Sequence, residues 1–560
     1  MADTPPAAEE IQLLRFLDGL DSEAETSKRD VSRHWDENLR QARGDQWRDD
    51  NRPPHFMANI IRHQIRKSVG TLTETKPQIQ VSAIKPNLDK AAVILYNTIK
   101  AIWDRGGTYD AIYRACQAAD TFSASFVTTT YNPLINEIEV NYVDPRQVYI
   151  DPALTTEYDL GGCQYVRIDH IMALNDVRRR YPGRGALVKP DDRLSSQYQS
   201  AGRNRSVFSS ILSMMPRPYR PQGGSKPGPI QRAEVREYWF RDYTANTSGG
   251  LLYPGGRHVL RSGNVILLDE KNPYWDGTFP IDMFVWDIDL DNVWGIDGIQ
   301  DLRRIQEAIN RLGDSFIHNA LLSSNFRIIA DMDALEPEQW EKLDNEPGLI
   351  IRKRPARQIE YQAPSPLDAS VFTTIQAMMQ MGDLLSGNND PGGGRSSAQG
   401  SAALEGLQTP KQTTLRAIAR RMESMLERVG QKLISRVLQF YTSDRVLFQL
   451  GPTQEWVAYT FVRQTLLEDD KGTALPPEER EQMFKDFRFM VTPGSSLAFT
   501  RMQRTMALLQ LRTATGVAPS LRRIIQEADI GDPDEVIKEG IEESKKLPQP
   551  PPPKGKGGRQ

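Results

Sequence analysis

Apolar side chains recur every three or four residues through the first 120 positions, and spacing of this kind predicts α-helices. Leu13, Leu14 and Leu17 give one modest apolar face to a polar stretch that runs to about Trp47. A second helix is predicted from Asn59, a residue type that favours helix N-caps. Two more follow, over about Leu88–Asp104 and Tyr109–Ala119.

The pattern then changes to short apolar runs that alternate with turn residues, which predicts strands. Phe126–Tyr131 and Ile135–Val143 flank Asn132-Pro133 and predict a hairpin. Further strands are predicted at Tyr165–Asp169, Glu234–Arg241 and Val259–Leu268 and within TFPIDMFVWDID, and a short helix at Asn175–Tyr181.

Two long amphipathic helices follow. The first covers Asp297–Leu322, where apolar residues form one stripe, and it would be roughly 39 Å long at 1.5 Å per residue. The second starts at Ser365-Pro366, an N-cap serine followed by proline, and runs to Leu385. Between them, Phe326–Asp331 and Leu349–Ile351 have the pattern of short strands.

Segments rich in glycine, proline and serine separate these elements. Residues 183–229 and 386–401 show little periodicity and are predicted to be mobile. A long helix is predicted over Ala402–Tyr441, then a mixed region to Val491 and a helical pair over Leu497–Thr513 and Leu521–Glu543. The proline-rich tail is predicted to be an extended, solvated end.

Composition limits the kind of protein. A chain of 560 residues is too long to fold around one ordinary hydrophobic core, so two to four lobes are expected. Lys plus Arg number 70 against 73 Asp plus Glu, a formal net charge of −3, whereas tight nucleic-acid binding needs a basic surface. Two cysteines form no disulfide framework, and no apolar run is long enough for a membrane span.

Enzyme signatures are weak. The glycines of 392–400 lack the lysine of a phosphate-binding loop, so a motor is not indicated. Asp287, Asp289 and Asp291 imitate the start of a calcium loop, but Asn292 and Gly298 stand where glycine and glutamate belong, which favours a strand end with exposed acids. The six histidines lack ligand spacing, so surface or interface positions are expected for them. No catalytic, cofactor or metal site is predicted.

Three stretches in a fixed order resemble the portal proteins (head–tail connectors) of tailed phages, above all those of short-tailed phages. They are GDQW with RPPHFMANIIRHQIRKSVGTLTETKPQIQV, then FPIDMFVWDIDLDNVWGIDGIQDLRRIQEAINRLGDSFIHNALLS with its Gln306 and Asn310, and then FRFMVTPGSSLAFTRMQRTMALLQL. The resemblance spans about 500 residues by its outermost motifs.

The resemblance implies an α+β, mostly helical portal fold. Its parts would be a wing (residues 1–294, with the unmatched insertion 183–229), stem helices 295–322 and 366–385, a clip (323–365) and a tunnel loop (386–401). The long helix and remaining wing (402–496), a helical crown (497–545) and a disordered tail (546–560) would follow.

The resemblance also implies a function and partners. The chain would form a twelve-subunit ring at one capsid vertex of the virion, made in the host cytoplasm, with double-stranded DNA in its channel. It would dock the terminase large subunit and then the head–tail adaptor, and contact capsid and scaffold proteins but no membrane.

Candidate site residues follow from the same resemblance. In the tunnel loop, Asn388, Asn389 and Arg395 are DNA-facing candidates, the alternative being an ordinary exposed loop. The clip offers terminase or adaptor docking candidates: Glu336, Glu338, Glu341, Arg352, Lys353 and Arg354. Subunits would pack through the stem by Leu302, Ile305, Ile309, Leu312, Phe316, Phe372, Ile375 and Met379.

Alternatives remain open at this stage. The row Arg421, Arg428, Lys432 and Arg436 has the look of a DNA stripe, but a solvated or inter-subunit face paired with Glu423 and Glu427 is favoured. A metal-dependent phage nuclease and a plain nucleic-acid-binding protein are the rival functions. DNA cleavage would support the first, and tight, steeply salt-dependent binding the second.

Overall fold

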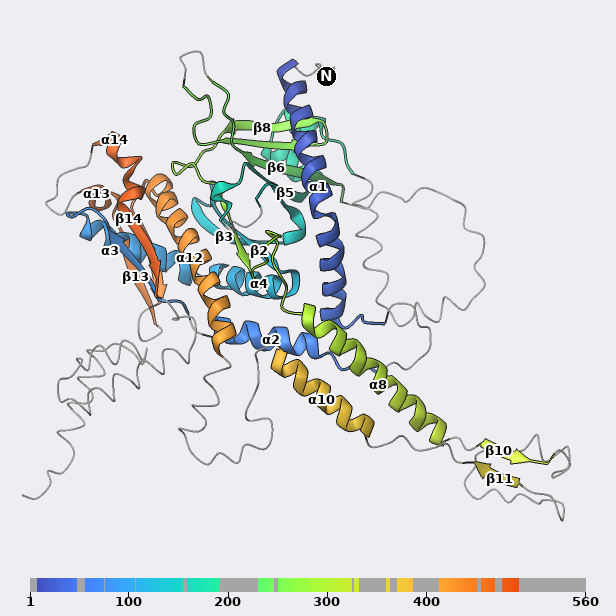
Figure 1. Ribbon diagram of the computed structural model, residues 1–560. Helices are drawn as coiled ribbons and strands as arrows, with labels where there is room; N and C mark the ends of the chain where they lie inside the picture. Colours follow the sequence, from blue (N-terminus) through green and yellow to red (C-terminus); the bar gives the residue numbers. More distant parts are fainter. Residues whose placement is uncertain are drawn as a thin grey trace, which may run out of the picture.

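The computed structural model describes residues 8–47, 56–74, 76–105, 107–154, 159–191, 230–245, 250–324, 327–331, 359–362, 370–385, 412–450, 455–468 and 476–492. Helices and small antiparallel sheets are mixed along these residues, as the α+β prediction requires. Most of them form a broad body, from which one pair of helices projects (Figure 1).

The four N-terminal helices are confirmed. They are α1 (Ala8–Arg43), α2 (Ile60–Thr73), α3 (Asp89–Asp104) and α4 (Gly107–Phe122). The Asn59 side chain accepts a 2.9 Å hydrogen bond from Arg62 N, which is the N-cap that its position predicts. The apolar faces of α2, α3 and α4 lie in the largest buried cluster.

Two sheets form the centre of the body. β2 (Ala124–Asn132) and β3 (Glu137–Val143) make the predicted hairpin, and β9 (Ile281–Val285) pairs with the other edge of β2. The second sheet has five antiparallel strands in chain order: β4 (Val148–Ile150), β5 (Tyr165–Ala173), β6 (Arg232–Phe240), β7 (Arg257–Ser262) and β8 (Val265–Lys271). The short helix α5 (Leu174–Arg180) follows β5.

The single strand predicted at Val259–Leu268 is wrong. Gly263, at φ +56°, turns the chain between β7 and β8, which pair with each other. Glycine adopts this left-handed conformation without the penalty that a Cβ brings, so one apolar run folds into two strands.

Helix α12 (Gln412–Phe440) runs through the largest core. It packs on β14 (Phe487–Val491), whose partner is β1 (Ile79–Ala83). A Cβ on Gly430 would lie 2.2 Å from Cδ1 of Phe489, so this glycine permits the close packing of helix on strand. Next to this layer lie α13 (Arg463–Leu466), α14 (Pro477–Arg480) and the hairpin of β12 (Arg445–Leu450) and β13 (Trp456–Phe461).

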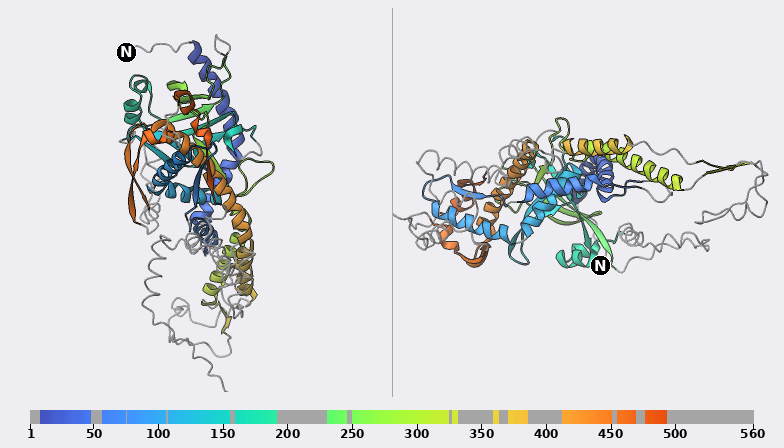
Figure 2. Two further views of the ribbon diagram at one scale, coloured as in Figure 1. Left: turned by 90° about the vertical axis from the view of Figure 1, so that its left-hand side faces the viewer. Right: turned by 90° about the horizontal axis from the view of Figure 1, so that it is seen from below.

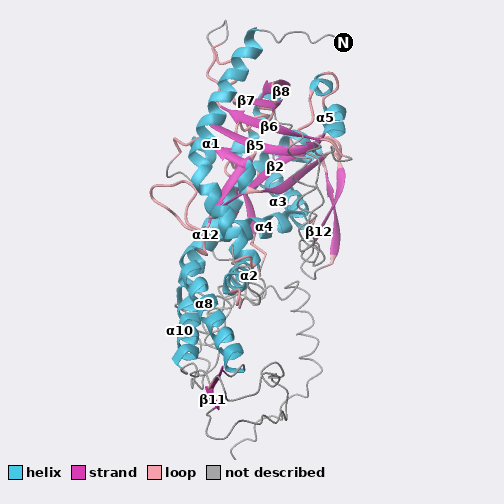
Figure 3. Cartoon of the chain, turned by 90° about the vertical axis from the view of Figure 1, so that its right-hand side faces the viewer, coloured by secondary structure: helices cyan, strands magenta, loops and turns pink. Residues whose placement is uncertain are grey.

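The projecting helices are α8 (Gln300–Ser324) and α10 (Ser370–Leu385). They remain side by side in the other views (Figures 2 and 3). β10 (Arg327–Ala330) follows α8 and pairs with β11 (Ile359–Gln362), a strand that the sequence pattern did not predict.

Several predictions lie outside the described residues. They concern residues 192–229 of the predicted insertion 183–229, the strand at 349–351, the N-cap at Ser365-Pro366, the loop 386–401, the start of the long helix before Gln412, and everything after Thr492. The first residues of that insertion are described: Arg184–Leu187 form a short 3-10 helix and Val188 is buried, so the prediction of a mobile segment is wrong there.

Candidate functional site

Helix α8 is fixed to the body by the amide side chain of Gln306, which is fully buried. Its Oε1 accepts hydrogen bonds from Ile60 N (2.8 Å) and Ile61 N (3.4 Å), two amides at the start of α2 that lack helical partners. Its Nε2 donates to Ala58 O at 2.6 Å. One side chain of the projecting helix therefore caps a helix of the body.

The next two turns of α8 extend this clamp. Asn310 accepts from Gln306 Nε2 (2.9 Å) and from Ala58 N (3.4 Å), and Asp314 accepts from Phe56 N (3.4 Å). Between them, a Cβ on Gly313 would lie 2.0 Å from Cδ1 of Phe56. Segment 56–61 thus crosses α8 along residues four apart, which share one helix face.

A charged set holds the beginning of α8 against α1. Asp297 Oδ2 lies 2.8 Å from His34 Nε2, and Asp297 Oδ1 accepts from Ile299 N at 3.1 Å in the turn just before the helix. Arg303 contacts His34 Nδ1 (3.2 Å) and forms an ion pair with Glu37 at 2.6 Å. The orientation of α8 is therefore set at both α1 and α2.

Asp120, near the end of α4, lies under this joint. Burial raises its pKa to about 8, and the nearby charge of Asp297 adds to the effect. A Cβ on Gly298 would lie 2.0 Å from Asp120 Oδ1, so only glycine fits between the carboxyl group and the chain entering α8.

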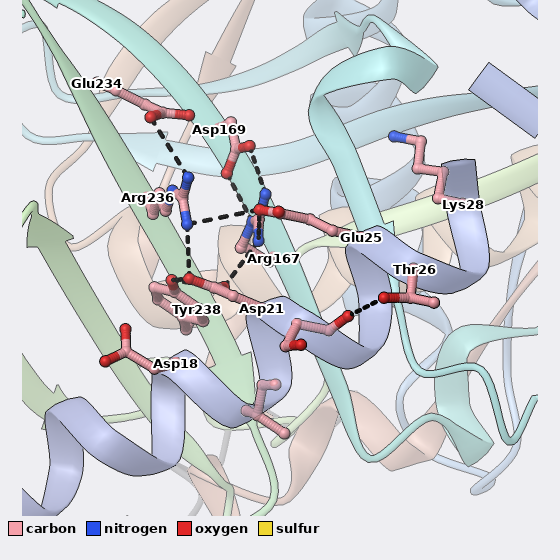
Figure 4. A network of polar contacts seen from close by, with 12 residues as sticks. Asp18, Asp21, Glu25, Thr26, Lys28, Arg167, Asp169, Glu234, Arg236 and Tyr238 are labelled. Atoms are coloured by element: carbon pink, nitrogen blue, oxygen red, sulfur yellow. Dashed lines mark hydrogen bonds and ion pairs between the residues drawn. The ribbon is translucent and has the colours of Figure 1, made fainter. Parts of the chain in front are cut away.

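Helix α1 is held on the five-stranded sheet by a buried ionic network (Figure 4). The Asp21 carboxylate accepts from Arg167 (2.7 Å), Arg236 (2.6 Å) and the Tyr238 hydroxyl (2.8 Å). Burial alone would raise the pKa of Asp21, but the arginines and the hydroxyl outweigh it, so the pKa is lowered. This network positions the helix that carries His34.

The predicted stem residues divide into three groups by exposure. Leu302 and Ile309 are buried in the subunit's own interior. Ile305, Leu312 and Ile375 are half-buried, and Gly382 of α10 lies close to Leu302 and Ile305, so α8 and α10 pack on each other there. Phe316 (48% exposed), Phe372 (58%) and Met379 (40%) point away from the chain.

The basic row on α12 is an internal structure. Arg421 donates to Trp286 O, Arg428 to Met283 O and Lys432 to Ile281 O, all on or beside β9. Lys432 also pairs with Asp282 at 2.9 Å and Arg436 with Asp276 at 2.5 Å. Lys432 and Arg436 are buried, so the row is no DNA stripe in the folded subunit.

The predicted carboxylate partners of this row, Glu423 and Glu427, are wrong. The acids come from residues 276–287, far away in the sequence. Glu427 accepts instead from Val491 N at 3.1 Å, and Glu423 is buried. Residue spacing along one helix cannot predict a partner that lies on a separate strand or loop.

The remaining candidate site residues lie outside the described residues: Asn388, Asn389, Arg395, Glu336, Glu338, Glu341, Arg352, Lys353 and Arg354. The acids Asp287, Asp289 and Asp291 follow the end of β9, in agreement with an exposed strand end. His258 is buried, against expectation, between Glu237 (3.1 Å) and Glu270 (3.0 Å).

The described residues show neither a metal cluster nor a membrane-spanning helix. They contain no group of three or more His, Cys, Asp or Glu side chains arranged to hold a metal ion. None of the helices they form is both long and apolar enough to cross a bilayer.

Comparison with known proteins confirms the resemblance seen in the sequence. No curated protein matches the chain. The family model described as phage P22-like portal protein matches residues 23–556, which is nearly the whole chain and includes the clamp, the projecting helices and α12. The protein therefore belongs to the phage P22-like portal protein family.

Proposed function

We propose that the protein is a structural subunit of a portal ring at one capsid vertex, through which double-stranded DNA is packaged and later ejected. The family supports a capsid-associated ring. The observation that carries the proposal for this chain is the projecting pair α8 and α10. The pair is anchored at one end, α10 is apolar along its exposed side, and α8 exposes Phe316.

Helix α10 is unusual for a helix facing water. From Ser370 to Gly382 it has no charged residue, and it exposes Phe372, Met379, Met381 and Leu385. Exposed apolar surface of this kind marks an interaction site. Methionines pack adaptably against irregular neighbours, which suits an interface whose two sides differ.

A ring needs such a surface on every copy. Its interface is heterologous, so one face of a subunit meets a different face of the next. In this proposal α8 and α10 are the stem, and Phe316, Phe372 and Met379 pack against the adjacent copy together with the half-buried Ile305, Leu312 and Ile375. We propose that this ring has twelve subunits, as the family resemblance implies.

The other parts are assigned by their place in the chain. Residues 1–294 with later segments form the wing, 323–365 the clip, 386–401 the tunnel loop and 497–545 the crown. The rigid clamp at Gln306 and the joint at Asp297 lie where the wing would meet the stem. Force on the stem would therefore reach α1 and α2 directly.

DNA would pass the tunnel loop, where Asn388 and Asn389 touch phosphates without a fixed charge and Arg395 adds one. A formal charge of −3 over the whole chain suits a conduit, because a ring of strongly basic subunits would hold the duplex by phosphate neutralisation. Glu336, Glu338, Glu341, Arg352, Lys353 and Arg354 of the clip would dock first terminase and then the adaptor, and the wing would meet capsid and scaffold.

Negative-stain imaging of the purified, full-length protein tests this proposal. Closed rings with a central hole are expected. Particles without a hole, or a protein that cleaves DNA with a divalent metal as a single chain, would contradict it.

A further inference from the structure

The hairpin of β12 and β13 exposes an apolar face that nothing in the described residues covers. Val446, Phe448 and Trp456 are each 58% exposed, while Leu447 and Phe461 on the opposite face are buried. The inner face packs on α3. A two-stranded sheet is marginally stable without further packing, so a large exposed apolar face on one calls for a partner.

The exposed face borders a groove of about 640 Å³. Ile135, from the turn between β2 and β3, lines the groove together with Phe448, and Arg445 donates to Asn136 O at 3.0 Å. An ion pair between Arg105 and Glu137 also lies in its wall. The groove is therefore mainly apolar, and of its charged residues Arg105 is paired with Glu137 while Arg445 is hydrogen-bonded to Asn136.

The described chain ends beside this hairpin. Thr492 N donates to Gln78 O at 2.9 Å, and two residues earlier Lys76 pairs with Asp104 at 3.3 Å. Asp104 in turn accepts from Leu450 N at 3.0 Å, and Leu450 is the strand partner of Trp456. A short series of contacts thus connects the exit point with the Trp456 end of the apolar face.

The sequence beyond this exit fits the face. After the linker Pro493-Gly494-Ser495-Ser496, the pattern predicts an amphipathic helix over Leu497–Thr513. Phe499, Met502, Met506 and Leu509 share one side of it. A helix of this span is about 25 Å long, and a six-residue strand about 20 Å, so one covers the other.

We propose that residues 497–513 pack as an amphipathic helix over the outer face of the β12–β13 hairpin of the same chain. The occupant carries Arg501, Arg504 and Arg512 and no acid, and the exposed acids Asp444 and Glu455 precede the two strands at opposite ends of the hairpin. The apolar stripe supplies the affinity, and the basic segment is complementary in charge to the acids at both ends of the hairpin. The proposal does not depend on ring formation.

Thiol labelling of the full-length protein tests this packing. The native Cys116 and Cys163 are buried, and burial raises their pKa to about 12 and about 11, so both stay silent towards maleimide. We compare F448C with Y243C, a control at a similarly exposed position after β6. F448C is expected to label roughly tenfold more slowly than Y243C, because the helix must open first.

A second pair of changes identifies the occupant. Adding M502D and M506D to F448C should restore labelling to the Y243C rate. Equal rates for F448C and Y243C without these changes, or protection that survives them, would overturn the proposal.

Disulfide formation decides which chain supplies the helix. Oxidised F448C/M506C should run as one chain on a non-reducing gel, and its two introduced thiols should no longer react with maleimide. Products of two or more chains in place of that band would contradict packing within one chain.

Discussion

Gln306 and Ile60 lie 246 residues apart in the sequence, yet the Gln306 side chain accepts the Ile60 amide at 2.8 Å and caps α2 from the side of α8. Gln306 also donates to Ala58 O, so one side chain bonds both an amide and a carbonyl of the same segment. The Ile60 amide also donates to Ala58 O at 2.9 Å, so Gln306 joins the projecting helix to a backbone turn that it reinforces.

Replacing this side chain should loosen the joint. Q306L removes the side-chain acceptor of the Ile60 and Ile61 amides and the side-chain donor to Ala58 O. Because Gln306 and Ile61 are buried, we expect the free energy of unfolding to fall by about 2 kcal/mol. Urea unfolding of both proteins measures it. E307A, on the exposed side of the same helix turn, is the matched control and should change stability by less than about 0.5 kcal/mol. Equal stability of Q306L and the unchanged protein would contradict the clamp.

The histidine–glutamate cluster of the five-stranded sheet predicts a pH dependence. Glu237 is hydrogen-bonded to His170 (2.7 Å) and His258 (3.1 Å). Burial opposes the charge on both histidines, but Glu237 outweighs it, and the pKa of each is raised above 6.5. Burial likewise opposes the charge of Glu237, but hydrogen bonds from both histidines outweigh it, and its pKa is lowered below 4.5.

The directions of these pKa shifts define the pH range in which the cluster stabilises the fold. A raised histidine pKa gives stability that is complete below the unfolded pKa of about 6.5 and is lost as pH rises through the folded pKa. A lowered glutamate pKa gives stability above about 4.5 that is lost as pH falls. E237Q should therefore cost most stability between about pH 4.5 and 6.5, and progressively less at higher pH. Thermal unfolding across this range measures it, and a cost that grows with pH above 6.5 would contradict the assignment.

The basic row on α12 predicts a loss of stability with no loss of DNA contact. R436A removes the buried partner of Asp276 and the guanidinium that lies 3.6 Å over the Tyr274 ring. Leaving that acid unpaired should cost about 3–5 kcal/mol. R420A, at an exposed position on the same helix, is the control. Denaturant unfolding measures the stability of both variants and of the unchanged protein. If R436A rings were as stable as the unchanged rings but retained less DNA, the result would instead support a DNA-binding row.

Deleting residues 387–400 tests the proposed tunnel loop. We expect rings to assemble as before, because the clamp and the packing between α8 and α10 lie elsewhere, while phage carrying the deletion package or retain less DNA. Particle imaging tests ring assembly, and measurement of the DNA per capsid tests packaging and retention. Loss of the ring itself would show that this segment belongs to the subunit interface.

Local rules recovered the elements that local forces determine. Asn59 predicted the start of α2, and Asn132-Pro133 predicted the turn between β2 and β3. The stripe on residues 299–316 predicted α8, although the helix itself begins at Gln300. The turn at Gly263 was missed because the apolar pattern on either side of it is the same as that of one continuous strand.

Long-range pairing was beyond such rules. The resemblance drew attention to Gln306 and Asn310, but their partners lie in segment 56–61 and became visible only in the fold. The partners of Arg421, Lys432 and Arg436 come from residues 276–287, and Glu423 and Glu427 were chosen wrongly because they were near in sequence. His258 has a polar side chain, yet two glutamates allow its burial.

The solution mass of F372D measured against V93D tests the central claim most directly. Phe372 on α10 and Val93 on α3 are almost equally exposed, at 58% and 59%, and both changes put a carboxylate on a helix surface. If α10 is the ring contact, V93D and the unchanged protein give particles many times 63.4 kDa, and F372D gives the mass of one chain. Intact F372D rings, or a single-chain mass for the unchanged protein and both variants, would contradict a ring held together through these helices.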